Sequence, residues 1–289
     1  MIPVMNIIAW GNVAPWPEQR QVEQDLIISR AIVELFSDPF LREQLRFRGG
    51  TALNKLHFPA PFRYSEDIDL VRTTKGAIGP VLHHVRDVLE PWLGGAAFDQ
   101  SQVAPKLKFR TEAEGVSSTA PLRLKVEINT REIDAYDEPE SIAYSVENPW
   151  FTGGAKIQTY SREEMLATKL RALLQRDKGR DLFDLAHALA VFDGLDTARV
   201  IEYFLRYLER AEVSISRAQA EQRMFAKLND PGFLADVLPL LAVSNAERWT
   251  DKSKKTAFSE VFSRFIVQIP GEPWAKSEEM RARFRLRLN

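Results

Sequence analysis

Apolar residues recur with two different periods along the first 130 residues of the chain. A spacing of three to four residues predicts amphipathic helices over residues 17–36 and 79–92. Strict alternation of apolar and polar residues predicts short strands over residues 45–48, 66–71, 106–110 and 122–128. Because strands and helical segments are interleaved, this part of the sequence predicts an α/β or α+β domain.

From about residue 160 onward, every strong pattern is helical. Ser161 is followed three residues later by Glu164, which predicts a capping box at the start of a leucine-rich helix. Gly179 is expected to interrupt this helical region, with the next helix starting at Asp181. Asp196 is placed to cap a third helix. The second half of the chain is therefore predicted to be mainly α-helical.

The change in character suggests two domains. The stretch over residues 148–154 contains proline, aromatic residues and two glycines, and we expect the boundary there. This gives one domain over residues 1–154 and a helical domain over residues 155–289. We find no internal repeat and no low-complexity region.

Composition and charge narrow the choice of function. The 40 acidic and 39 basic residues leave a net charge of -1, which excludes a uniformly basic surface but permits a local basic patch. The chain has no cysteine, so a disulfide, a thiolate metal site and a cysteine nucleophile are all excluded. The first 19 residues contain no Lys or Arg, and no apolar run is long enough to span a membrane. We expect a soluble, cytoplasmic protein without membrane contact.

The sharpest candidate for chemistry is a glycine pair followed by two acids. Gly49 and Gly50 stand at a predicted strand-to-helix turn, where backbone N–H groups can approach a phosphate closely. Asp67 and Asp69 alternate on a predicted strand, so both carboxylates face one side and suit divalent cations. Glu127, on the polar face of another strand, is a candidate third metal ligand. Together these residues predict a site for metal-assisted phosphoryl or nucleotidyl transfer.

Other interpretations of these acids remain open. Two acids around an isoleucine are common on half-exposed strands that bind nothing. Glu127 fits a salt bridge to Lys125 or Arg123 as well as it fits a metal site. No GxxxxGK[ST], GxGxxG, GxSxG or HExxH sequence occurs, which removes the commonest sequence signals for P-loop, dinucleotide, hydrolase and zinc-protease chemistry.

The motifs resemble those of a known family. The run FRGGTALNKL followed by RYSEDIDLV resembles the signature of the DNA polymerase beta-like nucleotidyltransferase superfamily, and more narrowly that of AbiEii-type toxins, including the MenT group. The segments QVEQDLIISRAI, LKVEIN and EEMLATKLRALLQRDKGRDLFDL are similar to the same family. The resemblance covers most of residues 17–191 and implies a nucleotidyltransferase domain with a mixed sheet, followed by a helical domain.

The resemblance also implies roles for the first group of residues. Gly49, Gly50 and Thr51 would form the turn that faces the nucleotide phosphates. Asp67 and Asp69 would bind one or two Mg²⁺ ions and act in catalysis.

A second group of residues matches the family further along the chain. Lys169 matches the motif lysine, expected to contact the phosphates in catalysis, and Asp184 matches a late catalytic aspartate. Lys169 follows the leucine stripe of its helix, so we expect its side chain to reach outward along the surface. Arg63 and Ser65 match the Arg-x-Ser-x-Asp pattern and could bind phosphate or fix the loop. Asp181 fits a helix-capping acid as well as a functional one.

The implied activity is transfer of a nucleoside monophosphate from an NTP to RNA. In the family resemblance the acceptor is the 3′ end of tRNA, its modification blocks aminoacylation and translation, and a cognate antitoxin protein is the partner. Three alternatives stay open: nucleotidylation of a protein or small molecule, kinase-like phosphotransfer, and a non-catalytic module that binds nucleic acid or an antitoxin. Basic clusters that could meet RNA, or could be ordinary solvated faces, comprise residues Lys106, Lys108 and Arg110; Arg176, Lys178 and Arg180; Lys252, Lys254 and Lys255; and Arg281, Arg283, Arg285 and Arg287.

Overall fold

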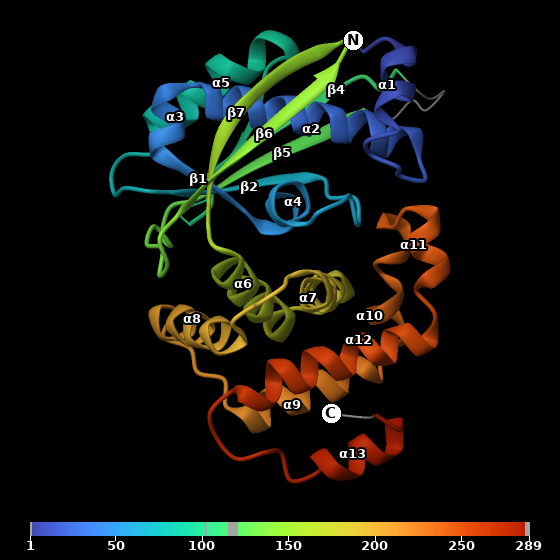
Figure 1. Cartoon of the computed structure of the whole chain (residues 1–289). Coiled ribbons are helices and arrows are strands. Elements are labelled where there is room, and N and C mark those ends of the chain that lie inside the picture. The colour runs from blue at the N-terminus through green and yellow to red at the C-terminus, as the bar shows by residue number, and fades with distance from the viewer. Residues whose placement is uncertain (1, 102, 115–120, 287–289) are drawn as a thin grey trace. The chain divides into compact units, whose positions relative to one another are not determined.

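The computed structural model describes residues 2–101, 103–114 and 121–286, which form two compact units divided between Ser161 and Arg162. The first unit combines a sheet with helices and the second is built from helices (Figure 1). The predicted fold class, an α/β or α+β domain with a mixed sheet followed by a helical domain, is therefore confirmed.

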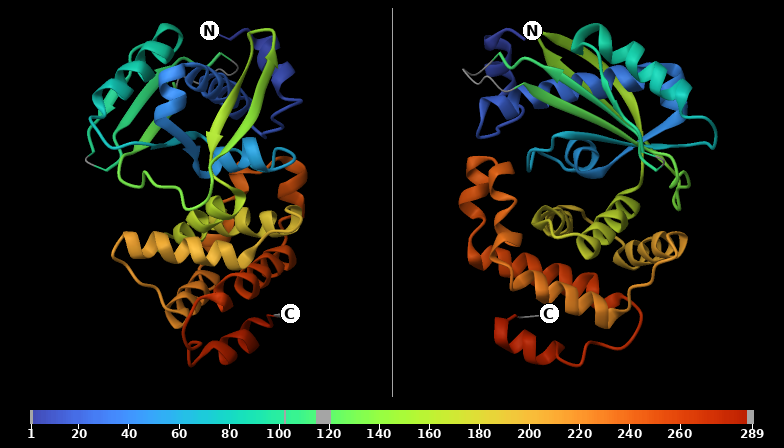
Figure 2. Two further views of the ribbon diagram at one scale, coloured as in Figure 1. Left: turned by 60° about the vertical axis from the view of Figure 1, so that its left-hand side comes forward. Right: turned by 180° about the vertical axis from the view of Figure 1, so that it is seen from behind.

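A seven-stranded sheet runs through the described part of the first unit, in the order β3-β4-β5-β2-β1-β7-β6 (Figures 1 and 2). Its strands are β1 (Leu45–Arg48), β2 (Asp67–Arg72), β3 (Ala97–Asp99), β4 (Lys106–Thr111), β5 (Leu122–Asn129), β6 (Glu140–Asn148) and β7 (Phe151–Thr159). Strand β2 pairs in parallel with β5, and β1 with β7, whereas the other neighbours are antiparallel. The sheet is thus mixed.

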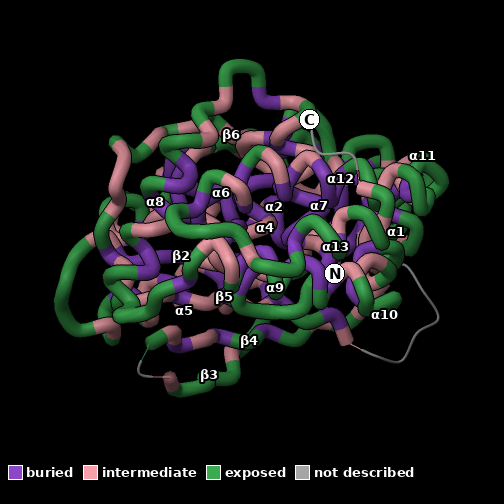
Figure 3. The backbone as a smooth tube through the Cα atoms, turned by 90° about the horizontal axis from the view of Figure 1, so that it is seen from below, coloured by how far each residue is buried: buried purple, intermediate pink, exposed green. Residues whose placement is uncertain are grey.

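Five helices accompany this sheet in the described residues: α1 (Val4–Trp10), α2 (Gln19–Ser37), α3 (Pro39–Gln44), α4 (Gly49–Ala52) and α5 (Gly79–Leu93). Helices α2 and α5 lie along one face of the sheet (Figures 1 and 2). Alternate strand residues are buried there, among them Ile68 in β2 and Val126 in β5, while the residues between them are less buried (Figure 3). The period-two pattern of the sequence thus sets which side chains face the core.

The hairpin of β6 and β7 corrects the predicted domain boundary. Gly154, the last residue of the predicted first domain, lies inside β7 and pairs with Ser145 of β6. Gly153 also belongs to β7, where a Cβ atom would lie 2.9 Å from the ring of Phe151. The two glycines therefore permit close packing within a strand instead of marking a linker, and the first unit continues to Ser161.

The described part of the second unit contains the helices α6 (Arg162–Gln175), α7 (Gly179–Val191), α8 (Thr197–Arg210), α9 (Arg217–Leu228), α10 (Pro231–Ala235), α11 (Val243–Arg248), α12 (Asp251–Arg264) and α13 (Ser277–Phe284). Asp196 caps α8 as predicted, because its carboxylate accepts a hydrogen bond from the Arg199 N–H at 3.0 Å. Arg287, predicted to belong to a basic cluster, lies outside the described residues. Across the described residues, no helix combines the length and apolar character that crossing a bilayer requires.

Gly179 has a different role from the one that the sequence suggested. It is the first residue of α7, not a break before a helix that starts at Asp181. A Cβ atom at this position would lie 1.9 Å from the carbonyl oxygen of Phe233. The start of α7 therefore packs directly against backbone, which only glycine allows.

Candidate active site

The turn between β1 and α4 is shaped by two glycines that have no room for a side chain. Gly49 has φ +82°, and a Cβ atom on it would lie 2.4 Å from a carboxylate oxygen of Asp69. A Cβ atom on Gly50 would lie 2.5 Å from a guanidinium nitrogen of Arg63. The helix that follows begins with these glycines and continues from Ala52 into a single π-helical turn over Leu53–His57. The backbone of Gly49 therefore lies directly against the Asp69 carboxylate of β2, with no side chain between them.

Asp67 and Asp69 lie on one face of β2, on either side of the fully buried Ile68. Asp69 is paired in register with Arg48, the last residue of β1, which places it beside the glycine turn. Burial raises the pKa of the Asp69 carboxyl, and the negative charge of Asp67 raises it further. The two carboxylates therefore form a locally unfavourable concentration of negative charge, which a cation would relieve.

Strand β5 brings Glu127 to the same face, but in a different setting from the one predicted. Lys125 is in register with Asp67, and Glu127 with Asp69. The Lys125 ammonium lies 3.0 Å from an Asp67 oxygen and 3.3 Å from a Glu127 oxygen, and Lys106 lies 3.5 Å from Glu127. Burial would lower the pKa of Lys125, but these carboxylates, Asp67 foremost, outweigh it and raise the pKa. Glu127 thus has the salt bridge to Lys125 that was the alternative to a metal-binding role.

A metal site of three carboxylates is not found. Within residues 2–101, 103–114 and 121–286, no three His, Asp or Glu side chains are grouped as ligands of one ion. That Glu127 completes a cage with Asp67 and Asp69 stays a prediction, because Lys125 pairs with Asp67 at least as closely as with Glu127. The two carboxylates that share one face of β2 are Asp67 and Asp69.

Thr51 and Ser65 connect α4, the helix that begins at Gly49, to β2, the strand that carries Asp67 and Asp69. The Thr51 hydroxyl lies 2.8 Å from the Ser65 hydroxyl and 2.5 Å from the backbone carbonyl oxygen of Asp67. Thr51 is buried, and Ser65 is partly exposed. These bonds fix the first turn of the helix relative to the residue that carries the first carboxylate.

Arg63 is buried and fixes the loop before β2. Its backbone N–H donates to the Asn54 side-chain oxygen at 3.3 Å, and its guanidinium donates to the carbonyl oxygen of Tyr64 at 3.0 Å. The Asn54 amide in turn donates to the carbonyl oxygen of Gly50 at 2.9 Å. Of the two roles open for Arg63, loop fixation is the one that these contacts describe.

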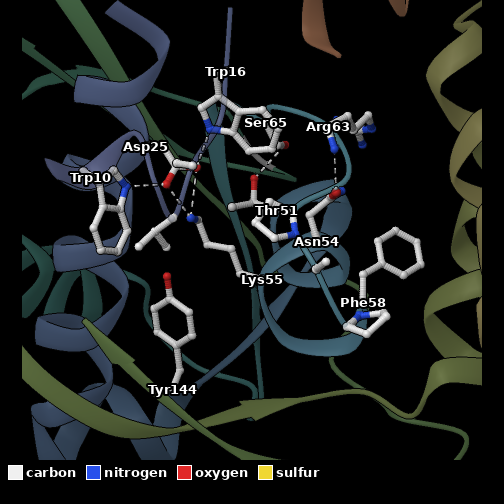
Figure 4. Close-up of a pocket in the computed structure, with 15 residues that line it drawn as sticks. Trp10, Trp16, Asp25, Thr51, Asn54, Lys55, Phe58, Arg63, Ser65 and Tyr144 are labelled. Carbon is white, nitrogen blue, oxygen red and sulfur yellow. Dashed lines mark hydrogen bonds and ion pairs between the residues drawn. The ribbon is translucent and has the colours of Figure 1, made fainter. Parts of the chain in front are cut away.

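A cavity of about 200 Å³ adjoins this helix within the first unit (Figure 4). Thr51, Arg63 and Ser65 contribute to its wall, so three residues of the predicted nucleotide-binding group face one space. Most of the remaining labelled wall is aromatic and is formed by Trp10, Trp16, Phe58 and Tyr144. The cavity joins residues that are far apart in the sequence.

A largely buried ion pair forms part of the wall of this cavity. The Lys55 ammonium is 3.0 Å from both carboxylate oxygens of Asp25 and 2.9 Å from the Ser29 hydroxyl. Asp25 also accepts hydrogen bonds from the indole nitrogens of Trp10, at 2.9 Å, and Trp16, at 3.1 Å. Burial disfavours the charged form of Lys55, but Asp25 outweighs this effect and raises the lysine pKa. The pair ties α2 to the helix that begins at Gly49.

The second unit gathers Lys169, Asp181 and Asp184 around one ammonium group. Lys169 lies 3.1 Å from an Asp181 oxygen and 2.8 Å from an Asp184 oxygen, and all three side chains are buried. The expectation that Lys169 reaches outward along the surface is therefore wrong, because the two aspartates of α7 draw it inward. Arg176 binds Asp181 through two nitrogens, at 2.7 and 2.9 Å.

The charges around Asp181 stabilise its ionised form. Burial alone would raise the pKa of Asp181, but Lys169 and Arg176 outweigh burial and hold the pKa at about 2. His187 lies one turn beyond Asp184, and burial lowers the pKa of His187 to about 4 although the charge of Asp184 opposes the change. The second unit therefore keeps Asp181 ionised and His187 neutral at neutral pH.

A protein-family model matches residues 30–262, which is most of the chain. The family is described as nucleotidyl transferase AbiEii toxin, type IV toxin–antitoxin system. The chain belongs to this family. It is accordingly a nucleotidyltransferase toxin, as the motifs predicted, and a type IV system implies an antitoxin as its partner.

Two solved structures share the fold of this AbiEii-family chain. The MenT4 nucleotidyltransferase toxin from Mycobacterium tuberculosis H37Rv superposes with a TM-score of 0.66 at 16% identity, covering 98% of this chain and 94% of that one. JHP933 from Helicobacter pylori gives a TM-score of 0.50 at 18% identity, with 93% and 94% covered. At such identities the likeness establishes the fold. A search of curated proteins gave no match.

The donor chemistry of this AbiEii-family site suits magnesium. Mg²⁺ prefers oxygen ligands and is usually bound through one or two carboxylates, with substrate phosphates and water in its other positions. Asp67 and Asp69 provide two such carboxylates on one strand face, next to the Gly49 turn. The residues present therefore fit the ion without a third protein carboxylate.

Sequence reasoning missed the cavity residues of the toxin. Asp25 stands inside the apolar pattern of α2 with Leu26, Ile27 and Ile28, and an acid in such a position signals a buried partner. Trp10 and Trp16 lie in a segment without any charged residue before Glu18. Nothing local in the sequence connects these residues to Lys55.

Proposed function

We propose that this AbiEii-family enzyme transfers a nucleoside monophosphate from an NTP to the 3′ end of tRNA. The observation that supports this most strongly is the pair Asp67 and Asp69 on one strand face, directly beside the side-chain-free turn at Gly49. A nucleotide added to the acceptor end would block aminoacylation and hence translation, which accords with a toxin. The cytoplasm, where tRNA is charged, is the compartment that the proposal implies.

The residues of the first unit would bind and orient the nucleotide. The backbone N–H groups at Gly49, Gly50 and Thr51 begin a helix and suit contacts with phosphate oxygens. Asp67 and Asp69 would hold Mg²⁺, which would neutralise charge on the triphosphate and on the departing pyrophosphate. Catalysis here consists mostly of positioning and electrostatic stabilisation.

In the proposed reaction, the 3′ hydroxyl oxygen of the acceptor forms a bond to the α-phosphorus of the NTP, and the hydroxyl proton is released to solvent. The bond between the α-phosphorus and the oxygen that bridges to the β-phosphorus breaks on the opposite side, and pyrophosphate leaves. The rigid contacts of Thr51 with Ser65 and with the Asp67 carbonyl would keep the phosphate-facing turn fixed during this displacement.

Lys169 and Asp184 are proposed to act as one unit in this reaction. Lys169 would offset negative charge on the nucleotide phosphates, as the family motif implies. Asp181 and Asp184 hold its ammonium at 3.1 and 2.8 Å, so the lysine is ordered before any ligand arrives.

Labelled nucleotides distinguish this proposal from its alternatives. The purified protein is incubated with Mg²⁺, bulk tRNA and each of the four NTPs, labelled either at the α- or at the γ-phosphate. We expect α-label in material that ribonuclease digests and protease does not. Label in protein would indicate a protein acceptor, and transfer of γ-label would indicate a kinase-like reaction. Failure of all four NTPs to label RNA would refute the tRNA proposal.

A further inference from the structure

The sheet face that carries Asp67 and Asp69 continues across β5 and β4 as a row of basic side chains. We call this set the basic strip, and it consists of Lys106, Lys108, Arg110, Arg123 and Lys125. The residues between them along the strands, such as Leu107 and Leu124, are buried in the core. Because side chains alternate along a strand, all members of the strip point to the side opposite the core.

Like charges face one another within the basic strip. The register of β4 and β5 places Lys108 opposite Lys125 and Arg110 opposite Arg123. Like charges directly opposite each other destabilise a sheet. Asp99 and Asp67 offset this repulsion for Lys108 and Lys125, so the pair that folding alone does not explain is Arg110 and Arg123. An anion bound across the strands would remove the repulsion.

The lysines and the arginines of the basic strip differ in how far their charge is neutralised. Lys125 lies 3.0 Å from Asp67, and Lys108 lies 2.6 Å from Asp99. Arg110 and Arg123 are both exposed, and neither has an ion pair with another residue that the structure describes. The net positive charge of the strip is therefore concentrated at this arginine pair.

Arg123, one member of this arginine pair, lies next to the loop that precedes β2, the strand that carries Asp67 and Asp69. The Gln24 side-chain amide donates to the Arg123 carbonyl oxygen at 2.8 Å and lies 3.4 Å from the carbonyl oxygen of Glu66. The backbone just before Asp67 thus runs beside the start of β5. Since neighbouring strands are about 4.8 Å apart, β4 lies roughly 10 Å from β2. The strip begins at the carboxylates and leads away from them across two strands.

We propose that the basic strip binds the phosphate backbone of the RNA acceptor strand and directs its 3′ end towards Asp67 and Asp69. This inference rests on the proposed transfer to RNA and identifies the surface that would bind the RNA acceptor. Arginine suits phosphate because its guanidinium can donate two parallel hydrogen bonds. The chain as a whole has a net charge of -1, so its attraction for a polyanion such as RNA must come from a local cluster of positive charge.

Affinity for RNA tests the basic strip without requiring turnover. Bulk tRNA labelled with a fluorophore at its 5′ end is titrated with wild-type protein and with the double variant Arg110→Glu, Arg123→Glu, in the absence of NTP. We expect the variant to bind about tenfold or more weakly near 0.1 M salt, and the slope of log K against log salt to fall by about 1 to 2.

A matched control changes two exposed cations elsewhere in the first unit. Arg42 and Lys75 lie near the opposite end of β2, where the Thr73 hydroxyl donates to the Glu43 carbonyl oxygen at 2.6 Å. The double variant Arg42→Glu, Lys75→Glu makes the same change in net charge. We expect its tRNA affinity to stay within about twofold of wild type, because its charges lie away from the strip.

A second variant, Arg110→Ala with Arg123→Ala, removes the like-charge pair without adding acids, and we expect it to fold with an unchanged or higher melting temperature. It should bind tRNA several times more weakly than wild type.

If wild-type protein labels tRNA but both arginine variants bind tRNA as wild type does, the strip proposal is overturned while transfer to tRNA stands. If the variants instead raise the KM for NTP and leave tRNA affinity unchanged, the strip serves the triphosphate and the proposal is also overturned. Absence of wild-type binding and transfer would overturn both proposals.

Discussion

The backbone at Gly49 approaches the Asp69 carboxylate so closely that a Cβ atom on the glycine would lie 2.4 Å from a carboxylate oxygen. This contact joins the turn that we propose faces the phosphates to strand β2 and leaves no space for even a methyl group. Two elements that the sequence separates by a helix and a loop thus form one surface, and this surface is the basis of the proposed chemistry.

Gly49→Ala should therefore damage catalysis more than folding. The added methyl group would displace the Asp69 carboxylate, and we expect kcat for nucleotidyl transfer to fall by about 10²-fold. Gly94→Ala is a matched control, because Gly94 has the same φ of +82° but no atom within 4 Å of a Cβ position. Both variants should lose about 1 to 3 kcal/mol of stability through the positive φ, and only Gly49→Ala should lose activity. Equal activities of the two variants in the labelling assay would contradict this account of the turn.

Lys55→Met should destabilise the first unit by about 3 to 5 kcal/mol, because it leaves Asp25 as an unpaired buried charge. Urea unfolding measures the change. As a control, Lys254→Met removes the partner of Asp251 in an exposed pair and should cost about 1 kcal/mol or less. A double variant with Asp25→Asn and Lys55→Met should recover part of the loss. If Lys55→Met loses no more unfolding free energy than the control, the ion pair is not what holds α2 to the helix that begins at Gly49.

His187 should make the second unit sensitive to pH between about 6.5 and 4. Burial lowers its pKa to about 4, below the ordinary value of 6.5, so the folded state favours the neutral imidazole. Its contribution to stability is therefore complete above pH 6.5 and is lost as the pH falls towards 4. Because the ring is partly exposed and solvent screens it, this contribution is smaller than the roughly 3 kcal/mol that the full shift would give. The contribution of Asp181, whose pKa is about 2, is lost only at lower pH, from about 4 down to 2.

Hydrogen exchange of the amides of α7 at several pH values measures this dependence. His187→Gln, which carries no titrating ring, should make the protection of α7 nearly constant between pH 6.5 and 4. Asp196→Asn at the cap of α8 is a control that replaces one capping residue with another and should leave the wild-type pH dependence in place. A wild-type profile that is flat over this range would show that His187 titrates normally.

Local patterns predicted the strands and helices that carry the site. Asp67, Ile68 and Asp69 alternate as they do in the structure, and the glycine pair stands at the start of the helix that the sequence placed there. The hairpin of β6 and β7 was not predicted, because glycines inside a strand resemble a linker when their neighbours are unknown. Sequence periodicity reports the local environment of a residue and says little about its distant partners.

Residues whose role depends on distant partners were harder to predict. Lys169 looked like a surface lysine from the leucine pattern of α6, but Asp181 and Asp184 of α7 hold it in the interior. The ion pair of Glu127 with Lys106 likewise depends on a neighbouring strand, because the register of β4 and β5 brings the two side chains together. Both outcomes depend on packing between elements, which a single sequence does not encode in any local pattern.

The central claim is that Asp69 takes part in nucleotidyl transfer to RNA, and one comparison tests it most directly. Asp69→Asn and the control Asp87→Asn, which changes an exposed acid on α5, are incubated with Mg²⁺, bulk tRNA and α-labelled NTP. We predict that Asp69→Asn leaves no detectable label in tRNA while wild type and Asp87→Asn label it at similar rates. Labelling of tRNA by Asp69→Asn at the wild-type rate would contradict the account.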